Sequence, residues 1–393
     1  MKKTMPKLSK SELDKLAVTK DDDLLTEFPG FKRSVLRSLK AQLPTIPETI
    51  GSDRELIKAK SSALNVGKKY NQLLSDYEKL EAERDALLQI KGASVESINI
   101  KPNKEGKSEA TPVICWSDWH IEEEVLKGNI NGLNEYNLEI ADFRIQNLFK
   151  NTLSLVNLCS RDVNITDLIV WLGGDFINGS IHEELVEGNL LSNMAASILA
   201  QKYIKSGIDF LLKHTKTNIK VVCNSGNHAR TTKQQRIATE SGNSLEYFIY
   251  NNLATIYEKE PRVMFLIPSG YHAYVNVYGY ILRFHHGHQM KYGGGVGGLY
   301  IPANKSIAQW NKGLHAVVKE LFGDVHIKGT LDIFGHFHQM RDGGSFICNG
   351  SVVGYNDYAL SIKADYEEPK QAFFLIDKKR GKTITTPILV NQN

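Results

Sequence analysis

The chain has 393 residues, of which 41% are hydrophobic and 23% are charged, and its formal net charge is +4. This length and composition predict a globular protein of two or three domains. No stretch approaches the roughly 18 consecutive apolar residues that a membrane span requires. The basic start MKKTMPKLSK leads into no apolar segment, so we expect neither a membrane protein nor a secreted one. The weak positive charge permits a polyanionic partner without demanding one.

The four cysteines, Cys115, Cys159, Cys223 and Cys348, are scattered and show no CxxC spacing. This distribution argues against a disulfide framework and against a thiolate zinc site. A reducing cytoplasm is therefore the expected compartment.

Residues 1–50 are predicted to form a small helical domain. Within it, DDDLLTEFPGFKRSVLRSLKAQL resembles the helix-turn-helix of many phage and bacterial DNA-binding proteins, with Pro29 and Gly30 in the turn. The second helix is basic, as a helix that contacts DNA phosphates must be. A helical cap or docking domain is the alternative. The residues expected to face inward are Leu24, Leu25, Phe28, Val35, Leu36 and Leu39, and the basic ones are Lys32, Arg33, Arg37 and Lys40.

Residues 53–90 show apolar side chains at alternating spacings of three and four, with charged residues between them. This a/d pattern predicts a coiled coil and hence a homodimer, and a single long helix lying on the folded domain is the alternative. The polar stretch that follows is predicted to be a linker over 91–110. The a/d positions are Leu56, Ala59, Ala63, Val66, Tyr70, Leu73, Tyr77, Leu80, Arg84 and Leu87.

From residue 111 to 393, short apolar strands alternate with helical stretches, and five predicted strands end next to Asp, Asn or His. Because open α/β sheets bind ligands at the carboxyl ends of strands, these side chains are expected to meet. Carboxylates, an amide and imidazoles together suit Mn, Fe or Zn better than Ca or Mg. The strands are Pro112–Trp116 before Asp118 and His120, Leu168–Leu172 before Asp175, Ile219–Cys223 before Asn227 and His228, Tyr280–Phe284 before His285, His286 and His288, and Leu331–Phe334 before His336 and His338.

Two of these blocks have a D-x-H or H-x-H spacing. Residues two apart on an extended segment project to the same side, so Asp118 with His120, and His336 with His338, can each reach one cluster. The glycines at 173, 174, 226, 287 and 335 permit the sharp turns that such loops need.

In order, the chain reads D-x-H, GD, GNH, HG and GHxH, and this series resembles the signature of the calcineurin-like metallophosphoesterases over about residues 110–360. That superfamily includes repair nucleases, cyclic-nucleotide phosphodiesterases and protein phosphatases. The resemblance implies an α/β fold with a two-sheet sandwich flanked by helices, over residues 111–393.

The resemblance also implies two divalent metal ions, with Mn expected and Fe, Zn or Mg as alternatives. A hydroxide held between the ions would attack phosphorus in line, and His228 would protonate the leaving oxygen or stabilise its charge. A histidine can donate a proton near pH 7, where a carboxylate is already ionised. The implied ligands are Asp118, His120 and His338 for one ion, Asn227, His286 and His336 for the other, and Asp175 as the bridge.

The sequence departs from the family pattern at two positions. Ala229 stands where an acid often orients the histidine, and Asn178 stands where a further acid is common, so we do not expect Asn178 to be a ligand. Arg230 offers a fixed cation for a phosphate oxygen. His288 remains an alternative to His286 as the fourth-block ligand.

Three functions follow from these features. The first is a dinuclear phosphodiesterase acting on DNA as a nuclease, localised by the N-terminal domain and paired through the coiled coil. The second is a phosphatase or cyclic-nucleotide phosphodiesterase acting on small or protein substrates. The third is a DNA-binding protein whose phosphoesterase domain is inactive, which the complete set of predicted ligands makes less attractive.

Overall fold

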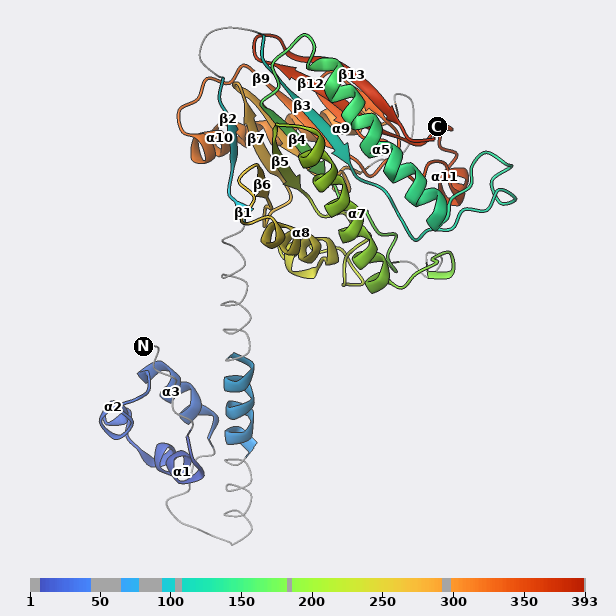
Figure 1. The fold of residues 1–393 in the computed structure, drawn as a ribbon. Coiled ribbons are helices and arrows are strands. Elements are labelled where there is room, and N and C mark those ends of the chain that lie inside the picture. Colours follow the sequence, from blue (N-terminus) through green and yellow to red (C-terminus); the bar gives the residue numbers. More distant parts are fainter. Residues whose placement is uncertain are drawn as a thin grey trace. The chain divides into compact units, whose positions relative to one another are not determined.

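The computed structural model describes residues 8–43, 65–77, 94–102, 108–181, 186–291 and 298–391. The chain divides into two compact units, Met1–Gln89 and Ile90–Asn393 (Figure 1). Within the described residues, no helix combines the length and the apolar character that crossing a membrane would need.

In the first unit, residues 8–43 form three short helices around a small apolar core. They are α1 (Lys10–Val18), α2 (Leu24–Glu27) and α3 (Arg33–Gln42). A capping box between Ser9 and Glu12 starts α1, because each side chain accepts a hydrogen bond from the other residue's backbone N–H. Leu16, Leu24 and Leu36 are fully buried at the centre of this core.

The helix pair expected around Pro29 is present in altered form. The first helix, α2, is only one turn long, and Leu25 is 40% exposed rather than inward-facing. Helix α1 was not anticipated, and its buried leucines supply the packing that a one-turn helix cannot. On the basic helix, Arg37 and Lys40 form ion pairs with Asp21. DNA binding by this unit stays a prediction.

Most of the predicted coiled coil, 53–90, lies outside the described residues, which include a helix over 65–77. Two of its a/d positions, Val66 and Tyr70, pack against the core of the first unit. Two others, Leu73 and Tyr77, have exposed side chains. Part of this apolar stripe therefore packs against the core of the same chain. The homodimer stays a prediction.

The second unit is a mixed α/β structure with two sheets. Sheet A has seven strands in the order β1-β6-β5-β4-β3-β12-β13, and sheet B has six in the order β10-β11-β9-β8-β7-β2. The strands β1, β6, β5, β4 and β3 run parallel, as do β8 and β9. The bounds are β1 Ser94–Val95, β2 Ile98–Ile100, β3 Ala110–Trp116, β4 Asp167–Leu172, β5 Asn218–Cys223, β6 Val263–Leu266, β7 Ala273–Val277, β8 Tyr280–Phe284, β9 Gly329–Phe334, β10 Arg341–Asp342, β11 Phe346–Cys348, β12 Lys370–Asp377 and β13 Gly381–Leu389.

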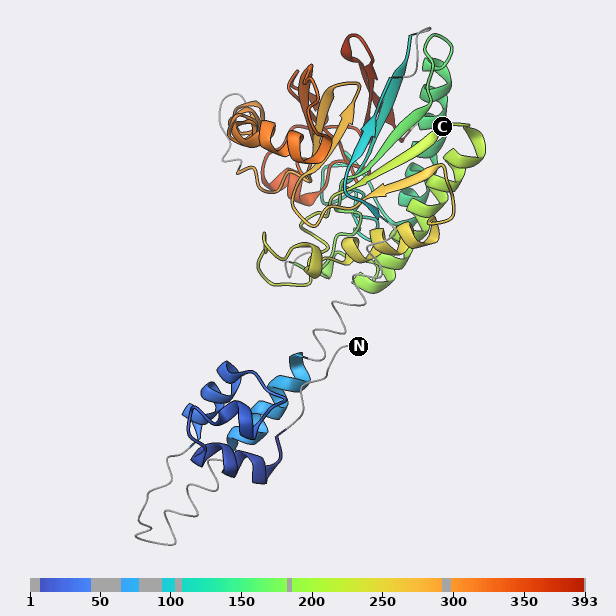
Figure 2. The same ribbon diagram turned by 90° about the vertical axis from the view of Figure 1, so that its left-hand side faces the viewer.

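Helices cover the outer face of each sheet (Figures 1 and 2). Sheet A needs this cover because apolar side chains alternate between its two faces along β4. Leu168, Val170 and Leu172 pack toward the helices, while Ile169 and Trp171 pack between the sheets. The helices on sheet A are α5 (Leu138–Cys159), α7 (Asn193–His214) and α8 (Leu245–Ile256), those beside sheet B are α9 (Tyr300–Trp310) and α10 (Leu314–Phe322), and the short elements are η2 (Ser241–Asn243), η3 (Asn311–Gly313) and α11 (Asp357–Ser361).

The five strands expected before the motif residues are confirmed, and each ends at the predicted residue. The linker predicted over 91–110 needs correction where it contains strands. Ser94–Val95 form β1 and Ile98–Ile100 form β2, which add parallel edge strands to sheet A and sheet B respectively, and Ala110 is the first residue of β3. Ile98 and Ile100 are buried on either side of exposed Asn99, an alternation too short to stand out in a polar stretch.

Candidate metal centre

Three groups of side chains in the second unit are close enough to hold a metal ion, and all come from loops that follow strands. Within each group, one ligand atom per residue lies within 4.8 Å of the others. Because the groups share His120 and Asp175, they form one continuous set, which we name the metal cluster. The groups are Asp118, His120 and His338; Asp175, His286 and His336; and His120, Asp175 and His228.

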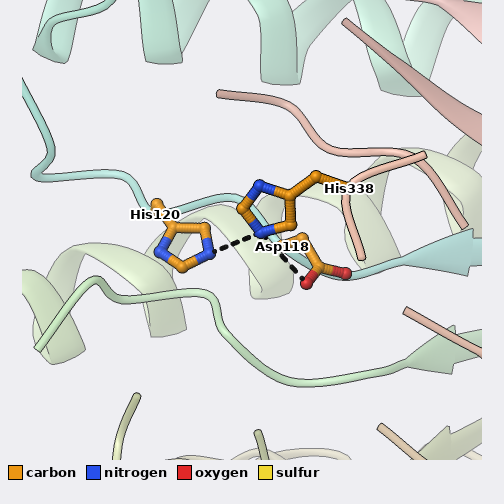
Figure 3. Close-up of side chains that lie close together, drawn as sticks. All are labelled: Asp118, His120 and His338. Carbon is orange, nitrogen blue, oxygen red and sulfur yellow. Dashed lines mark hydrogen bonds and ion pairs between the residues drawn. The ribbon is translucent and has the colours of Figure 1, made fainter. Parts of the chain in front are cut away.

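The first group joins the loop after β3 to the loop after β9 (Figure 3). His120 Nε2 lies 3.1 Å from His338 Nε2, which lies 3.5 Å from Asp118 Oδ1. Two facing ring nitrogens at this distance require a shared proton or a common cation. His120 Nδ1 lies 3.0 Å from Asn178 Oδ1, which can accept its proton and leave the Nε2 lone pair toward His338.

The second group is centred on Asp175. His286 Nε2 lies 2.8 Å from Asp175 Oδ2, and His286 Nδ1 lies 2.7 Å from the carbonyl oxygen of Gly173. Since a carbonyl only accepts, Nδ1 donates to it and Nε2 is directed at the cluster. This is the outer hydrogen bond that metal-ligating histidines usually make. The His336 ring centroid lies 5.2 Å from that of His286.

His228 joins the third group and is held in the same way. Its Nδ1 lies 2.7 Å from the carbonyl oxygen of Asn178, and its Nε2 lies 4.0 Å from Asp175 Oδ2. Its backbone N–H donates to Asp175 Oδ1 at 2.9 Å. The carbonyl oxygen of Asn178 therefore orients the His228 imidazole. Ala229, which stands where the motif often has an orienting acid, is buried in the core between sheet A and its helices.

Three further residues lie beside these groups. His288 Nε2 is 3.0 Å from Glu240 Oε1, so the structure brings His286 rather than His288 into the metal cluster. Asn227 Oδ1 is buried and has no hydrogen-bond partner in the described part of the chain, a state that suits a ligand atom. Arg230 donates to the carbonyl oxygens of Asn227 and Thr232, so it braces this loop, and its contact with phosphate stays a prediction.

The backbone of the cluster is unusual. Eight non-glycine residues in the described segments have positive φ, and five of them are predicted ligands. Each such conformation costs on the order of 1–3 kcal/mol and persists only where the surroundings impose it, which is common at functional sites. The five are Asp118 (55°), His120 (44°), Asp175 (52°), His336 (69°) and His338 (55°).

Burial and mutual charge shape the ionisation of the cluster. Burial lowers the pKa of His120, of His336 and of His338, the last to about 4, which keeps these imidazoles neutral and able to bind a cation. Burial opposes the charge on Asp175, yet the nearby histidines, His286 first, hold its pKa well below the usual value. Burial raises the pKa of Asp118 to about 7. A bound cation would favour the ionised carboxylates.

The sequence reasoning missed three supporting residues. Asn178 contacts His120 through its Oδ1 and His228 through its carbonyl oxygen. Its place in the motif points only to a possible metal ligand, not to this supporting role. Buried Glu122 accepts from the backbone N–H groups of Asn178 and the next residue. Glu246, on α8, accepts from two other loops. Glu122 lies only two residues after His120, a position that could have drawn attention, but nothing in the sequence marks Glu246.

No family model matches the chain, and no curated protein matches it. Among solved structures, a hypothetical protein from Pyrococcus horikoshii OT3 matches at a TM-score of 0.34 and 11% identity, covering 72% of this chain and 89% of that one. Sulfate thiohydrolase SoxB of Thermus thermophilus, solved with glycerol, matches at 0.27 and 11%, covering 73% and 58%. Both scores are below 0.5, too low to establish a common fold.

Proposed function

We propose that residues 111–393 form a dinuclear metal-dependent phosphodiesterase that acts on DNA as a nuclease. The main support is the pair of residue groups that meet at the carboxyl ends of strands from both sheets. One contains Asp118, His120 and His338, the other Asp175, His286 and His336. Asn227 would complete the second group through its unpaired Oδ1, and Asp175 would bridge the two.

When bound, two divalent ions would supply Lewis acidity and an activated water near neutral pH. Oxygen and imidazole donors without thiolates suit Mn, with Fe, Zn or Mg as alternatives. The protein's own contribution is to hold the donors in place. The Nδ1 atoms of His120, His228 and His286 are each fixed by an oxygen, so every Nε2 faces the cluster.

His228 is the proposed general acid. Its Nε2 lies 4.0 Å from Asp175 Oδ2, beside the proposed metal ligands, and we assign it to proton transfer rather than to metal binding. With Nδ1 donating to the Asn178 carbonyl, a protonated Nε2 can donate to the oxygen that leaves phosphorus. Arg230 lies two residues further on and is proposed to bind a phosphate oxygen.

DNA as the substrate is supported by the first unit. Helix α3 and its N-cap carry four basic residues, of which Lys32 and Arg33 make no ion pair in the described part of the chain. Such cations would supply sequence-independent contacts with phosphates. A homodimer through 53–90 would pair two such units, which raises the effective concentration of the second unit once the first has bound.

One experiment tests the proposal. The purified protein is incubated with Mn²⁺ and bis-p-nitrophenyl phosphate, p-nitrophenyl phosphate, single-stranded DNA or duplex DNA, with and without residues 1–90. We expect hydrolysis of the diester and of DNA, with weaker DNA turnover for the shortened chain. Hydrolysis of the monoester alone would point to a phosphatase. DNA binding without Mn²⁺-dependent turnover would indicate an inactive phosphoesterase domain.

A further inference from the structure

Glu246 is a fully buried carboxylate near the start of α8 that belongs to none of the three metal-binding groups. Its Oε1 accepts the backbone N–H of Phe176 at 2.8 Å, and its Oε2 accepts the backbone N–H of Gly226 at 2.7 Å. Phe176 directly follows Asp175, and Gly226 directly precedes Asn227. One side chain therefore joins the loop of the proposed bridging ligand to the loop of a proposed terminal ligand.

These two loops touch through their backbones. A Cβ on Gly174 would lie 2.1 Å from the backbone nitrogen of Gly226, and a Cβ on Gly226 would lie 2.0 Å from Asp175 Oδ1. The two loops are thus in close contact at these glycines, and Asp175 Oδ1 accepts the backbone N–H of His228, so the amides of Phe176 and Gly226 need a further acceptor. Glu246 provides it. An unpaired buried N–H would cost about 1–3 kcal/mol.

Helix α8 is also fixed on the second loop at two other points. The backbone N–H of Leu245 donates to the carbonyl oxygen of Ala229 at 2.9 Å, and Tyr250 Oη donates to the carbonyl oxygen of Asn224 at 3.1 Å. These contacts lie on either side of Asn227. Since the helix is anchored there, a change at Glu246 alters the link to Asp175 without freeing the helix from the loop.

We propose that Glu246 is a positioning residue that sets the separation of Asp175 and Asn227, and through it the affinity of the site for a pair of metal ions. This inference rests on the proposed function of the site. The hydrogen bonds that Glu246 accepts come from the backbone of the two loops, so its positioning role is exerted through that backbone. Metal ligands are commonly supported by such outer contacts, whose loss lowers metal affinity by about 10–100-fold.

The test compares the full chain with Glu246→Leu, which removes both acceptors, and Glu246→Gln, which keeps one oxygen acceptor and places a donor opposite the other amide. Glu109→Gln is the matched control, because Glu109 is a buried carboxylate just before β3, at the opposite end of that strand from Asp118. Circular dichroism and thermal unfolding establish that each variant is folded.

Two readouts are used. Titration with Mn²⁺, followed by calorimetry and by the paramagnetic resonance signal of coupled ions, should show about 10–100-fold weaker pair binding in Glu246→Leu and a smaller loss in Glu246→Gln. In the metal-free Glu246 variants, the backbone amides of segments 174–178 and 224–228 should exchange faster than in the metal-free wild type. Glu109→Gln should match the wild type in both measurements.

The outcomes separate this inference from the proposed function. Wild-type Mn²⁺ binding and wild-type exchange in both Glu246 variants would overturn the positioning role. If the wild-type chain bound no pair of ions, the proposed function would fail, and hydrogen exchange would still decide whether Glu246 holds the two loops together. If Glu246→Leu did not fold, Glu246→Gln would carry both measurements.

Discussion

The second unit contains two side-chain clusters that include neighbouring histidines but pair their charges in different ways. His285 and His286 are neighbours at the end of β8, and both are buried. His286 faces Asp175 in the metal cluster. His285 belongs to a second set, which we name the aromatic cluster, in which its ring stacks on Phe334 at 5.3 Å between centroids. The aromatic cluster consists of His272, Arg283, His285, Trp310, Asp332 and Phe334.

The aromatic cluster satisfies its own charges. Arg283 donates to both oxygens of Asp332, at 2.7 and 2.9 Å, and Trp310 lies 5.3 Å from the guanidinium. His285 Nε2 lies 3.5 Å from the same carboxylate. In the metal cluster, by contrast, the ion-pair partners of the carboxylates within the described segments are all histidines. The two clusters therefore differ in that a fixed cation, Arg283, pairs with the carboxylate of the aromatic cluster, whereas the carboxylates of the metal cluster pair only with histidines in the described segments.

The largest effect is expected at Asp175. Asp175→Ala removes the carboxylate shared by two groups, so both ions should be lost and hydrolysis should fall to the background rate. Metal content by mass spectrometry and turnover of bis-p-nitrophenyl phosphate check this. Full metal occupancy in the variant would contradict a bridging role for Asp175.

His228→Ala should affect chemistry alone. The variant should retain the metals and lose about 10²–10⁴-fold in turnover, which is the usual contribution of a general acid. The loss should be smaller for a diester with a good leaving group, which needs less protonation. Unchanged rates on DNA would remove the catalytic role of this histidine.

Asp332→Ala should show the opposite profile. Removing one partner of a buried ion pair leaves Arg283 uncompensated and should cost about 3–5 kcal/mol in the free energy of unfolding. Mn²⁺ affinity of the folded variant should stay at the wild-type value, because Asp332 belongs to the aromatic cluster. Urea unfolding and calorimetry measure the two quantities. A drop in Mn²⁺ affinity would show that the clusters are not independent.

The smallest effect concerns acid stability. Burial, with help from His285 and Arg283, lowers the pKa of His272 to about 2. The unfolded chain takes up a proton below its ordinary pKa while the folded chain does not, so stability is lost as the pH falls below that value. The contribution should reach about 2 kcal/mol at pH 5. The His272→Leu variant should not show this part of the loss of stability at low pH.

Urea unfolding at pH 7 and pH 5 in the presence of EDTA measures the His272 contribution as a difference between variant and wild type. The histidines of the metal cluster are present in both proteins, so their contributions cancel. Equal pH dependence in the two proteins would contradict the lowered pKa of His272.

Much of the second unit could be predicted from local pattern. Apolar runs that end in glycine or a polar residue located β3, β4, β5, β8 and β9, because a buried strand must be apolar and must stop at a turn. The same pattern failed at 94–100, where β1 and β2 are too short for a periodicity to be seen. In the first unit, Leu25 was placed inward by its residue type, but a one-turn helix has too narrow a buried face for it.

Strand-end position brought Asp118, His120, Asp175, His336 and His338 together as candidates, along with all three histidines of the 285–288 block, because ligand-type side chains at the ends of parallel strands converge. Strand-end position alone could not choose among these histidines, and the choice of His286, with His288 as the alternative, came from the family resemblance. Only the packing of sheet B put His285 among aromatic rings and His286 against Asp175. The positive φ angles and the hydrogen bonds to Glu246 could not be predicted from the sequence either, because they depend on loops that meet only after folding.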